Sequence, residues 1–244
     1  MASTMIAVDL GGTQIRAARF SETSEMEERV SLETHAQEGF EPVFGRVLDA
    51  VRQVWPDRGD VAAVGMGVPG PINFKTGLLR FAPNLPGWDN LPLRRMLGDR
   101  LGVPVTVGND ADVAALAEHR FGAGRGVSDL IYLTISTGIG GGIIHDGRLF
   151  TGGNGLGGEV GHMAIDPRGP KCSCGNTGCL EVMASGTAIA RRARERLADG
   201  ELSVMREWLG EDVAAVTARD VTQAAHRGDA LAISLYREVG ATIG

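Results

Sequence analysis

The segment Glu159-Val-Gly-His-Met-Ala-Ile-Asp-Pro-Arg-Gly-Pro-Lys-Cys-Ser-Cys-Gly-Asn-Thr-Gly-Cys-Leu-Glu181 is the most informative stretch of this chain. It holds all 3 cysteines, and His162 precedes the first of them by ten residues. An odd number of thiols cannot all pair as disulfides, which a reducing compartment disfavours in any case. Three thiolates and one imidazole complete a tetrahedral zinc site, with His162, Cys172, Cys174 and Cys179 as its ligands. The alternative is a cluster of three chemically idle thiols.

A closed site of this kind supports structure and leaves no open position for hydrolysis. Here it would hold a loop that has few apolar residues of its own. The second ring nitrogen of His162 would remain free to face a substrate hydroxyl. We therefore predict a zinc site that supports substrate recognition.

Two glycine-rich turns can bind phosphate groups. In the first, Asp9-Leu-Gly-Gly-Thr13, a carboxylate, backbone N–H groups and a hydroxyl follow a short strand, and Asp9 could hold Mg²⁺ directly or through water. In the second, Thr134-Ile-Ser-Thr-Gly-Ile-Gly-Gly-Gly142, hydroxyls accompany four glycines. Neither has the lysine of the Walker pattern. A hairpin turn with a polar edge explains the first equally well, and a structural bend is the alternative for the second.

Asn109-Asp110 follows a predicted strand, Val103–Val107, and precedes a predicted helix, Ala111–His119. Open α/β sheets bind ligands at the carboxyl ends of their strands. An aspartate there can accept the proton of a substrate hydroxyl as a general base. The alternative is a helix N-cap, a position that favours both Asn and Asp.

Strand and helix patterns alternate along the chain and predict an α/β fold with a largely parallel sheet. A hairpin is expected over 5–20, a buried strand over 61–68, and a helix after Asn90 as its cap. Helical patterns dominate after Cys179, and Thr217-Ala-Arg-Asp220 is a capping-box signature. We predict a smaller lobe over 1–122, with the first turn and Asp110, and a larger lobe over 123–244, with the second turn and the zinc loop. The remaining expected elements are helices 40–55, 185–197 and 230–243, strands 130–135 and 141–145, and a loop over 151–161.

Composition excludes some partners. The net charge is −6, so we expect no nucleic-acid partner. The sequence has no apolar run long enough to span a membrane and no signal peptide over 1–9, so we expect a cytoplasmic protein. Glycine is abundant, with 36 of 244 residues, which indicates many tight turns and close backbone approaches.

Taken together, these motifs resemble the ROK family of sugar kinases and repressors, most closely its bacterial glucokinases. The resemblance extends from residue 5 to about residue 190 and follows the order of the family's motifs. The matching segments are Asp9–Thr13, Pro69-Gly70, Pro83-Asn84-Leu85, Asn109-Asp110, Ser136–Gly142, Glu159–His162 and Cys172–Glu181. It implies an actin-like, ribonuclease-H-like fold of two lobes, in which ATP and sugar meet in the cleft.

The resemblance also implies a role for individual residues. Asp110 would be the catalytic base for the sugar 6-hydroxyl, and zinc would bind the four ligands given above. The sugar would be held by Gly70, Asn84, Asn109, Asp110, Glu159, His162 and Glu181. The triphosphate would be cradled by Asp9, Gly11, Gly12, Thr13, Thr137, Gly138, Gly140 and Gly141, with Mg²⁺ at Asp9.

The sequence departs from the family pattern at two places. Gln14 stands where the family often has lysine, although glutamine can still donate a hydrogen bond to a phosphate oxygen. The family's chain also continues past the helix that here ends at Gly244, with a strand and Gly-Gly turn that receive the adenosine and a final helix. We expect the sugar and zinc portions of the site to be complete and the adenosine portion to be missing.

The implied reaction is ATP-dependent phosphorylation of a hexose, with glucose as the first candidate. Mannose, N-acetylmannosamine, fructose and allose are alternative acceptors. A sugar-sensing regulator of the repressor branch and a catalytically impaired sugar-binding fragment are the alternatives of other classes. Members of the family are commonly dimers or tetramers, so we expect a homo-oligomer.

Overall fold

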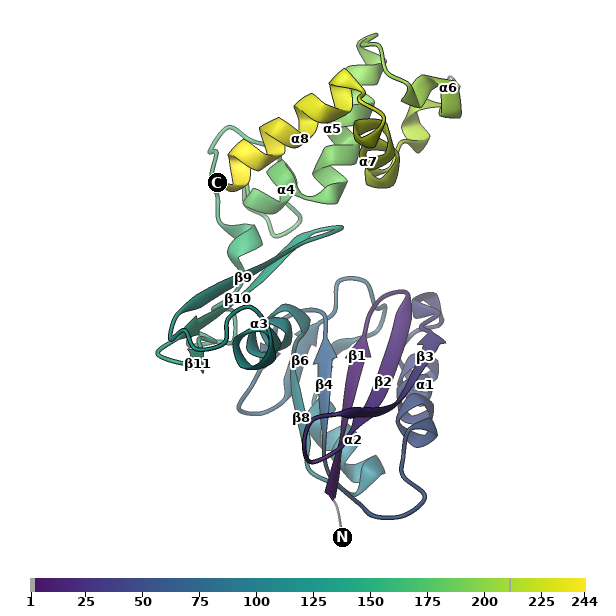
Figure 1. Cartoon of the computed structure of the whole chain (residues 1–244), viewed down its shortest axis with the longest axis vertical. Coiled ribbons are helices and arrows are strands. Elements are labelled where there is room, and N and C mark those ends of the chain that lie inside the picture. The colour runs from purple at the N-terminus through teal and green to yellow at the C-terminus, as the bar shows by residue number, and fades with distance from the viewer. Residues whose placement is uncertain (1–2, 211) are drawn as a thin grey trace. The chain divides into compact units, whose positions relative to one another are not determined.

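A computed structural model describes residues 3–210 and 212–244 of the chain (Figure 1). The chain divides into two compact units. The first consists of Met1–Tyr132 with Gly142–Gly158, and the second of Leu133–Gly141 with Glu159–Gly244. This grouping reflects contacts within the chain, and it takes residues 123–132 and 142–158 into the first unit. The functional division into lobes 1–122 and 123–244 stays a prediction.

The first unit is built on a five-stranded sheet in the order β3-β2-β1-β4-β8. Its strands are β1 (Ser3–Leu10), β2 (Gln14–Phe20), β3 (Met26–Glu33), β4 (Asp60–Val68) and β8 (Val105–Asn109). The first three are antiparallel neighbours, and β4 and β8 run parallel to β1. The predicted hairpin and the strand over 61–68 are confirmed, and β8 begins two residues later than expected.

Apolar side chains alternate along β1 and fix which face of the sheet is buried. Ile6, Val8 and Leu10 are buried, whereas Met5 and Asp9 point to the exposed face. Helix α1 (Phe40–Gln53) packs on β1, β2 and β3 through Val43, Val47 and Val51. The hydrophobic periodicity predicted this helix because its apolar residues recur at helical spacing.

The other helices of the first unit lead toward the site. Helix α2 (Leu93–Leu101) packs against β8, and α3 (Asp110–Phe121) follows β8 directly. The prediction that Asn90 caps α2 is wrong. Asn90 lies in a short strand with a left-handed φ of 53°, and Pro92 occupies the N-cap. A three-stranded sheet of β5 (Ile72–Asn73), β6 (Leu78–Phe81) and β7 (Asp89–Leu91) precedes this helix.

A further sheet contains β9 (Leu130–Ile135), β10 (Ile139–His145) and β11 (Arg148–Leu149), in the order β11-β10-β9. The second glycine-rich segment forms the turn between β9 and β10, where the Ser136 N–H donates to the Gly138 carbonyl at 2.9 Å. Strands β9 and β10 were both predicted, and β10 begins two residues earlier than expected.

Helices make up most of the second unit. The helices α4 (Leu180–Ala184), α5 (Gly186–Ala198), α7 (Ala218–His226) and α8 (Ala230–Ile243) pack on one another, and α6 (Met205–Leu209) joins this cluster. Ser185 caps α5. Thr217 and Asp220 form the capping box that begins α7, as the sequence predicts. Short 3₁₀ turns occur at η1 (Ala36–Glu38), η2 (Val160–His162) and η3 (Val213–Ala215). Among the described residues, no helix has the length and apolar character needed to cross a membrane.

Candidate active site

Asp110 is the first residue of α3, immediately after the carboxyl end of β8. Its Oδ1 lies 2.9 Å from the Ala111 N–H, which holds the carboxyl at the start of the helix. The residue is open to solvent on one side, yet desolvation by the protein around the carboxyl raises the pKa of Asp110, and the charge of Asp9 raises it further. A raised pKa brings a carboxylate closer to the range in which a general base works best.

The N-cap alternative considered from the sequence is confirmed for Asn109, whose side chain caps α3. Its Oδ1 accepts hydrogen bonds from the backbone N–H groups of Ala111 at 2.9 Å and Asp112 at 3.2 Å. Its Nδ2 donates to the Gly70 carbonyl at 3.1 Å. An amide nitrogen has two hydrogens, so one N–H of Asn109 is still available for a ligand.

Gly70 lies in the loop after β4 and tolerates no side chain. Its φ is 98°, and a Cβ at this position would lie 2.1 Å from the Phe81 carbonyl oxygen. The close approach lets the Gly70 carbonyl reach Asn109. The structure thus brings together Gly70 and Asn109, two residues that the family resemblance assigns to the sugar.

The first glycine-rich turn joins β1 and β2, and the Gly11 N–H donates to the Gln14 carbonyl at 2.9 Å. Gly12 passes beside Asn84, since a Cβ on Gly12 would lie 3.3 Å from the Asn84 Cβ. Asp9 stands opposite Arg16 in the antiparallel register, and the Arg16 guanidinium donates to Asp9 Oδ2 at 3.0 Å. The same guanidinium donates to Gln14 Oε1 at 2.7 Å.

Arg16 was not singled out from the sequence. Register is the signal that could have found it, because a hairpin loop of residues 11–14 pairs position 10 with position 15 and position 9 with position 16. Its guanidinium supplies a positive charge beside the first turn, close to Gln14, where the family often has lysine.

Glu181, near the start of α4, is hydrogen-bonded to the end of the second turn. Glu181 Oε2 accepts a hydrogen bond from the backbone N–H of Ile139 at 3.0 Å. Thr137 and Gly138 lie in the turn itself, whereas Gly140 and Gly141 lie within β10. Gly161 packs on the carbonyl group of Ile139, so closely that a Cβ on Gly161 would lie 1.9 Å from the Ile139 carbonyl oxygen. Ile139 therefore contacts both segments that carry the expected sugar ligands of the second unit.

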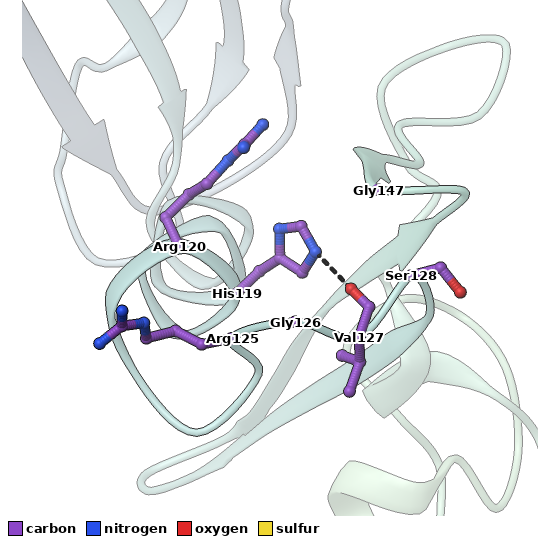
Figure 2. Close-up of a pocket in the computed structure, with 7 residues that line it drawn as sticks. All are labelled: His119, Arg120, Arg125, Gly126, Val127, Ser128 and Gly147. Carbon is purple, nitrogen blue, oxygen red and sulfur yellow. Dashed lines mark hydrogen bonds between the residues drawn. The ribbon is translucent and has the colours of Figure 1, made fainter.

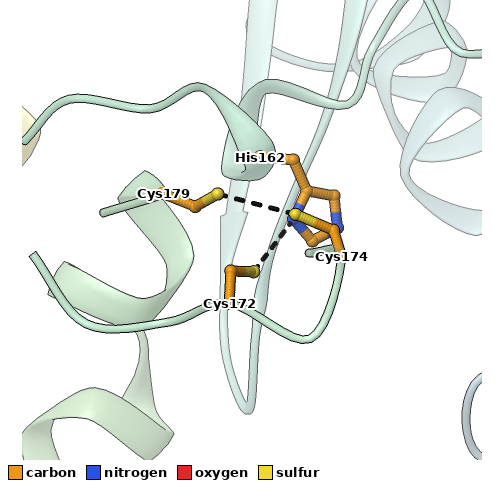
Figure 3. A group of neighbouring side chains, drawn as sticks. All are labelled: His162, Cys172, Cys174 and Cys179. Atoms are coloured by element: carbon orange, nitrogen blue, oxygen red, sulfur yellow. Dashed lines mark hydrogen bonds between the residues drawn. The ribbon is translucent and has the colours of Figure 1, made fainter. Parts of the chain in front are cut away.

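His162, Cys172, Cys174 and Cys179 converge on one point (Figure 3). Their ligand atoms all lie within 4.8 Å of one another. The His162 Nδ1 is 3.6 Å from Cys172 Sγ, and Cys174 Sγ is 3.6 Å from Cys179 Sγ. The four residues form a cluster that could hold a metal ion.

Backbone hydrogen bonds fix the loop that carries these ligands. The Cys172 N–H donates to the Asn176 carbonyl at 2.9 Å, and the Gly175 N–H donates to the Cys172 carbonyl at 3.0 Å. Cys172 and Cys179 are buried, whereas Cys174 is exposed. Burial and the neighbouring thiols raise the pKa of Cys179 to about 12, while a backbone N–H of Asn176 lowers the pKa of Cys174.

The remaining expected site residues are divided between the two units. The first unit holds the residues of the first turn together with Gly70, Asn84, Asn109 and Asp110. The second holds the residues of the second turn together with Glu159, His162, Glu181 and the cysteines. Glu159 immediately precedes η2, which ends at His162.

An aspartate at the carboxyl end of a strand, two glycine-rich turns and a histidine–cysteine cluster on one α/β chain are the features that the sequence predicted for a ROK sugar kinase. The chain belongs to the ROK family, whose sequence model matches residues 5–244. It has the actin-like ATPase fold of the ROK sugar kinases, as the family resemblance implied.

Several curated relatives match most of the chain. A glucokinase of Thermotoga maritima is 40% identical over 235 residues, which cover 96% of this chain and 74% of that protein. An N-acetylmannosamine kinase of Escherichia coli O157:H7 is 35% identical over 243 residues, with 98% and 79% covered. A xylose repressor of Caldicellulosiruptor bescii is 37% identical over 202 residues, with 83% and 50% covered.

Solved structures show the same fold. The ROK hexokinase of Thermus thermophilus superposes with a TM-score of 0.80 at 36% identity, covering 98% of this chain and 74% of that one. A ROK glucokinase of Streptomyces griseus, solved with glucose and AMPPNP, gives a TM-score of 0.80 at 36% identity, with 97% and 75% covered. Sugar kinases thus resemble this chain in both sequence and fold.

Proposed function

We propose that the protein phosphorylates a hexose at its 6-hydroxyl with ATP, and that glucose is the acceptor. The observation that carries this proposal is the placement of Asp110, at the carboxyl end of β8, with a raised pKa and beside Asn109 and Gly70. The similarity to the glucokinases of Thermotoga maritima and Streptomyces griseus supports the choice of glucose. The proposal includes a cytoplasmic location.

In the proposed reaction, Asp110 accepts the proton of the sugar 6-hydroxyl. The sugar 6-oxygen attacks the γ-phosphorus of ATP, and ADP leaves. The free N–H of Asn109 and the side chains of Asn84, Glu159, His162 and Glu181 bind sugar hydroxyls. The backbone N–H groups of the two glycine-rich turns bind phosphate oxygens. Catalysis then rests on positioning, because phosphoryl transfer needs little covalent chemistry from the protein.

Asp9 is the proposed residue for Mg²⁺. Its carboxyl is about half exposed at the end of β1, and Arg16 bonds to only one of its oxygens. A bound Mg²⁺ would neutralise charge on the phosphates. Oxygen donors of this type suit the ion.

We propose zinc as the metal of the histidine–cysteine cluster. A tetrahedron with Zn–S bonds of about 2.3 Å and Zn–N bonds of about 2.0 Å separates two sulfurs by about 3.8 Å and a sulfur from a nitrogen by about 3.5 Å. The separations of 3.6 Å at Cys174–Cys179 and at Cys172–His162 fit this geometry. The metal would hold the loop and, through it, the ring of His162.

A coupled assay of sugar-dependent ADP formation tests the proposed function. We expect turnover with glucose, and a panel with mannose, N-acetylmannosamine, fructose and allose compares the acceptors. Because one relative is an N-acetylmannosamine kinase, N-acetylmannosamine is the main alternative to glucose as the acceptor. If no sugar supports ADP formation, calorimetry separates a sugar-binding protein without nucleotide affinity from one that binds neither, and a DNA gel shift tests the regulator class suggested by the xylose repressor.

A further inference from the structure

Thr34 lies directly after β3 and is fully buried beside the first glycine-rich turn. Its hydroxyl donates to the Gly11 carbonyl at 2.7 Å. Its backbone N–H donates to the Thr13 carbonyl at 2.9 Å. One buried residue, distant from the turn in the sequence, therefore holds two carbonyl groups of the turn.

Thr34 is itself fixed by helix α1. The Arg46 guanidinium, on α1, donates to the Thr34 carbonyl at 3.0 Å and also pairs with Glu38. The hydroxyl, the N–H and the carbonyl of Thr34 are thus all hydrogen-bonded within the first unit. The protein alone therefore fixes the place of Thr34.

Holding a carbonyl group also sets the direction of the N–H that follows it. A trans peptide is planar, so the Gly11 carbonyl and the Gly12 N–H point in opposite directions. The bond from Thr34 to this carbonyl therefore directs the Gly12 N–H away from Thr34. Gly12 is exposed, and within the described residues its N–H donates no hydrogen bond to a protein acceptor. The turn thus presents a donor whose direction is set by Thr34.

We propose that Thr34 is a positioning residue of this turn, which holds the Gly12 N–H in the direction in which it meets a phosphate oxygen. This role rests on the proposed function, in which the phosphates of ATP bind at the turn. A donor that is held in place before the ligand arrives gives tighter binding, because little conformational freedom is lost on association. Without the Thr34 hydroxyl, the peptide that joins Gly11 to Gly12 would be free to rotate.

Inorganic tripolyphosphate is the probe for this role, because it carries the phosphates of ATP without the adenosine. Nuclear magnetic resonance follows the amide signal of Gly12 in ¹⁵N-labelled protein during the titration. Potassium chloride at matched ionic strength is the reference. We expect a saturable shift of this signal with tripolyphosphate and none with chloride.

Two substitutions of Thr34 separate its hydroxyl from its shape. Thr34→Val removes the hydroxyl and nearly preserves the shape, and Thr34→Ser keeps the hydroxyl. The dissociation constant of tripolyphosphate should rise about fivefold or more in Thr34→Val, as expected for one lost hydrogen bond, and stay within about twofold of the parent in Thr34→Ser. Thr34→Ala is a second variant without the hydroxyl, to be used if valine prevents folding.

Thr4→Val is the matched control. Thr4 is also buried in the first unit, and its hydroxyl lies 3.4 Å from the Asp60 carbonyl oxygen. Asp60 begins β4 and is not among the expected phosphate ligands. Thr4→Val should therefore bind tripolyphosphate as the parent does.

A second control separates positioning from a general loss of stability. His119 is buried, and its Nε2 lies 2.9 Å from the Val127 carbonyl oxygen, which ties the end of α3 to the segment before β9 (Figure 2). None of the expected phosphate ligands lies in that segment. His119→Leu should lower Tm, because it removes this bond, and leave the dissociation constant of tripolyphosphate within about twofold of the parent.

The coupled assay distinguishes this role from the proposed function. With turnover in the parent, Thr34→Val should raise the KM for ATP about fivefold or more and leave the KM for sugar within about twofold. An unmoved Gly12 signal in the parent, a shift that chloride reproduces, equal binding by Thr34→Val and the parent, or an equal loss in His119→Leu would overturn the positioning role. If the parent forms no ADP while tripolyphosphate binding still depends on the Thr34 hydroxyl, the proposed function fails and the positioning role stands.

Discussion

Glu181 accepts the backbone N–H of Ile139 at 3.0 Å, so an expected sugar ligand is bonded to the base of an expected phosphate turn. One carboxylate oxygen is used by this bond, and in the proposed function the other would bind a sugar hydroxyl. The orientation of Glu181 and the shape of the turn therefore depend on each other. A substitution of Glu181 that breaks the bond to Ile139 should raise the KM values for both sugar and ATP. A substitution that keeps the bond should mainly affect the KM for sugar.

For Glu181→Ala, we expect the KM values for sugar and for ATP to rise together, each by about tenfold or more, because a charge-assisted hydrogen bond is lost at each place. Glu181→Gln retains an oxygen that accepts from Ile139, so its KM for ATP should stay within about twofold of the parent. Steady-state kinetics with each substrate varied measure this. Glu207→Gln, an exposed glutamate on α6, is the control. Equal effects of both Glu181 variants on ATP would contradict the positioning role.

Replacement of the proposed base has a different signature. Asp110→Asn should lower kcat by about 10²–10⁴-fold, the usual contribution of a general base, and leave the sugar dissociation constant within about twofold. Calorimetry measures sugar binding, and the coupled assay measures turnover. Retained turnover would exclude Asp110 as the base, and lost sugar binding would make it a binding residue.

The raised pKa of Asp110 predicts the acid side of the pH profile. The base acts when ionised, so kcat/KM should rise with pH through a value above the ordinary aspartate range. Burial is the main cause of the shift, and the charge of Asp9 adds to it. Asp9→Asn should therefore lower the pKa of Asp110, which ¹³C resonance of the Asp110 carboxyl measures without any need for activity. An unchanged Asp110 titration in this variant would exclude the influence of Asp9.

His145 provides a second pH-dependent test, outside the proposed site. Its Nδ1 lies 2.7 Å from Asp129, and this hydrogen bond, with the charges of Asp146 and Asp129, raises the pKa of His145. A raised histidine pKa in the folded state stabilises the fold below the unfolded pKa, and this contribution disappears as pH rises through the folded value. Histidine resonances should show His145 titrating above the ordinary histidine range, and Asp129→Asn should lower that midpoint.

Metal analysis tests the zinc cluster. We expect about one zinc per chain, released by a strong chelator with a fall in Tm. Cys179→Ser removes a buried ligand and should abolish stoichiometric zinc, whereas Ser173→Ala changes the same loop without touching a ligand. Full zinc content in Cys179→Ser would exclude the proposed ligand set.

Local patterns predicted much of this fold because the longer elements carry a clear signal. Helix α1 buries one apolar stripe, and the capping box at Thr217 marks the start of α7. The strands β5, β6 and β7 have two to four residues, too few for an alternation to stand out, and they were not expected. Asn90 looked like a cap because residue type alone does not reveal that its backbone is left-handed and already part of β7.

The candidate site, like the fold, could be predicted from the sequence only in part. The cysteine spacing indicated the cluster because metal ligands must lie close together in space. Asn109 could not be assigned to capping or to a ligand from its position. The structure shows that its Oδ1 caps α3, and its role as a sugar ligand stays a prediction. The bond between Glu181 and Ile139 joins positions 42 residues apart, and no local pattern reports such a contact.

The packing of Gly161 on the Ile139 carbonyl limits which amino acids position 161 can accept. A library of all substitutions should return no functional variant at position 161, since even a methyl group would lie 1.9 Å from that oxygen. Gly153, with no atom near its would-be Cβ and no positive φ, should accept many side chains. Glycines that look alike in the sequence thus differ sharply in the substitutions they tolerate. Gly161, the more restricted of the two, lies between Glu159 and His162.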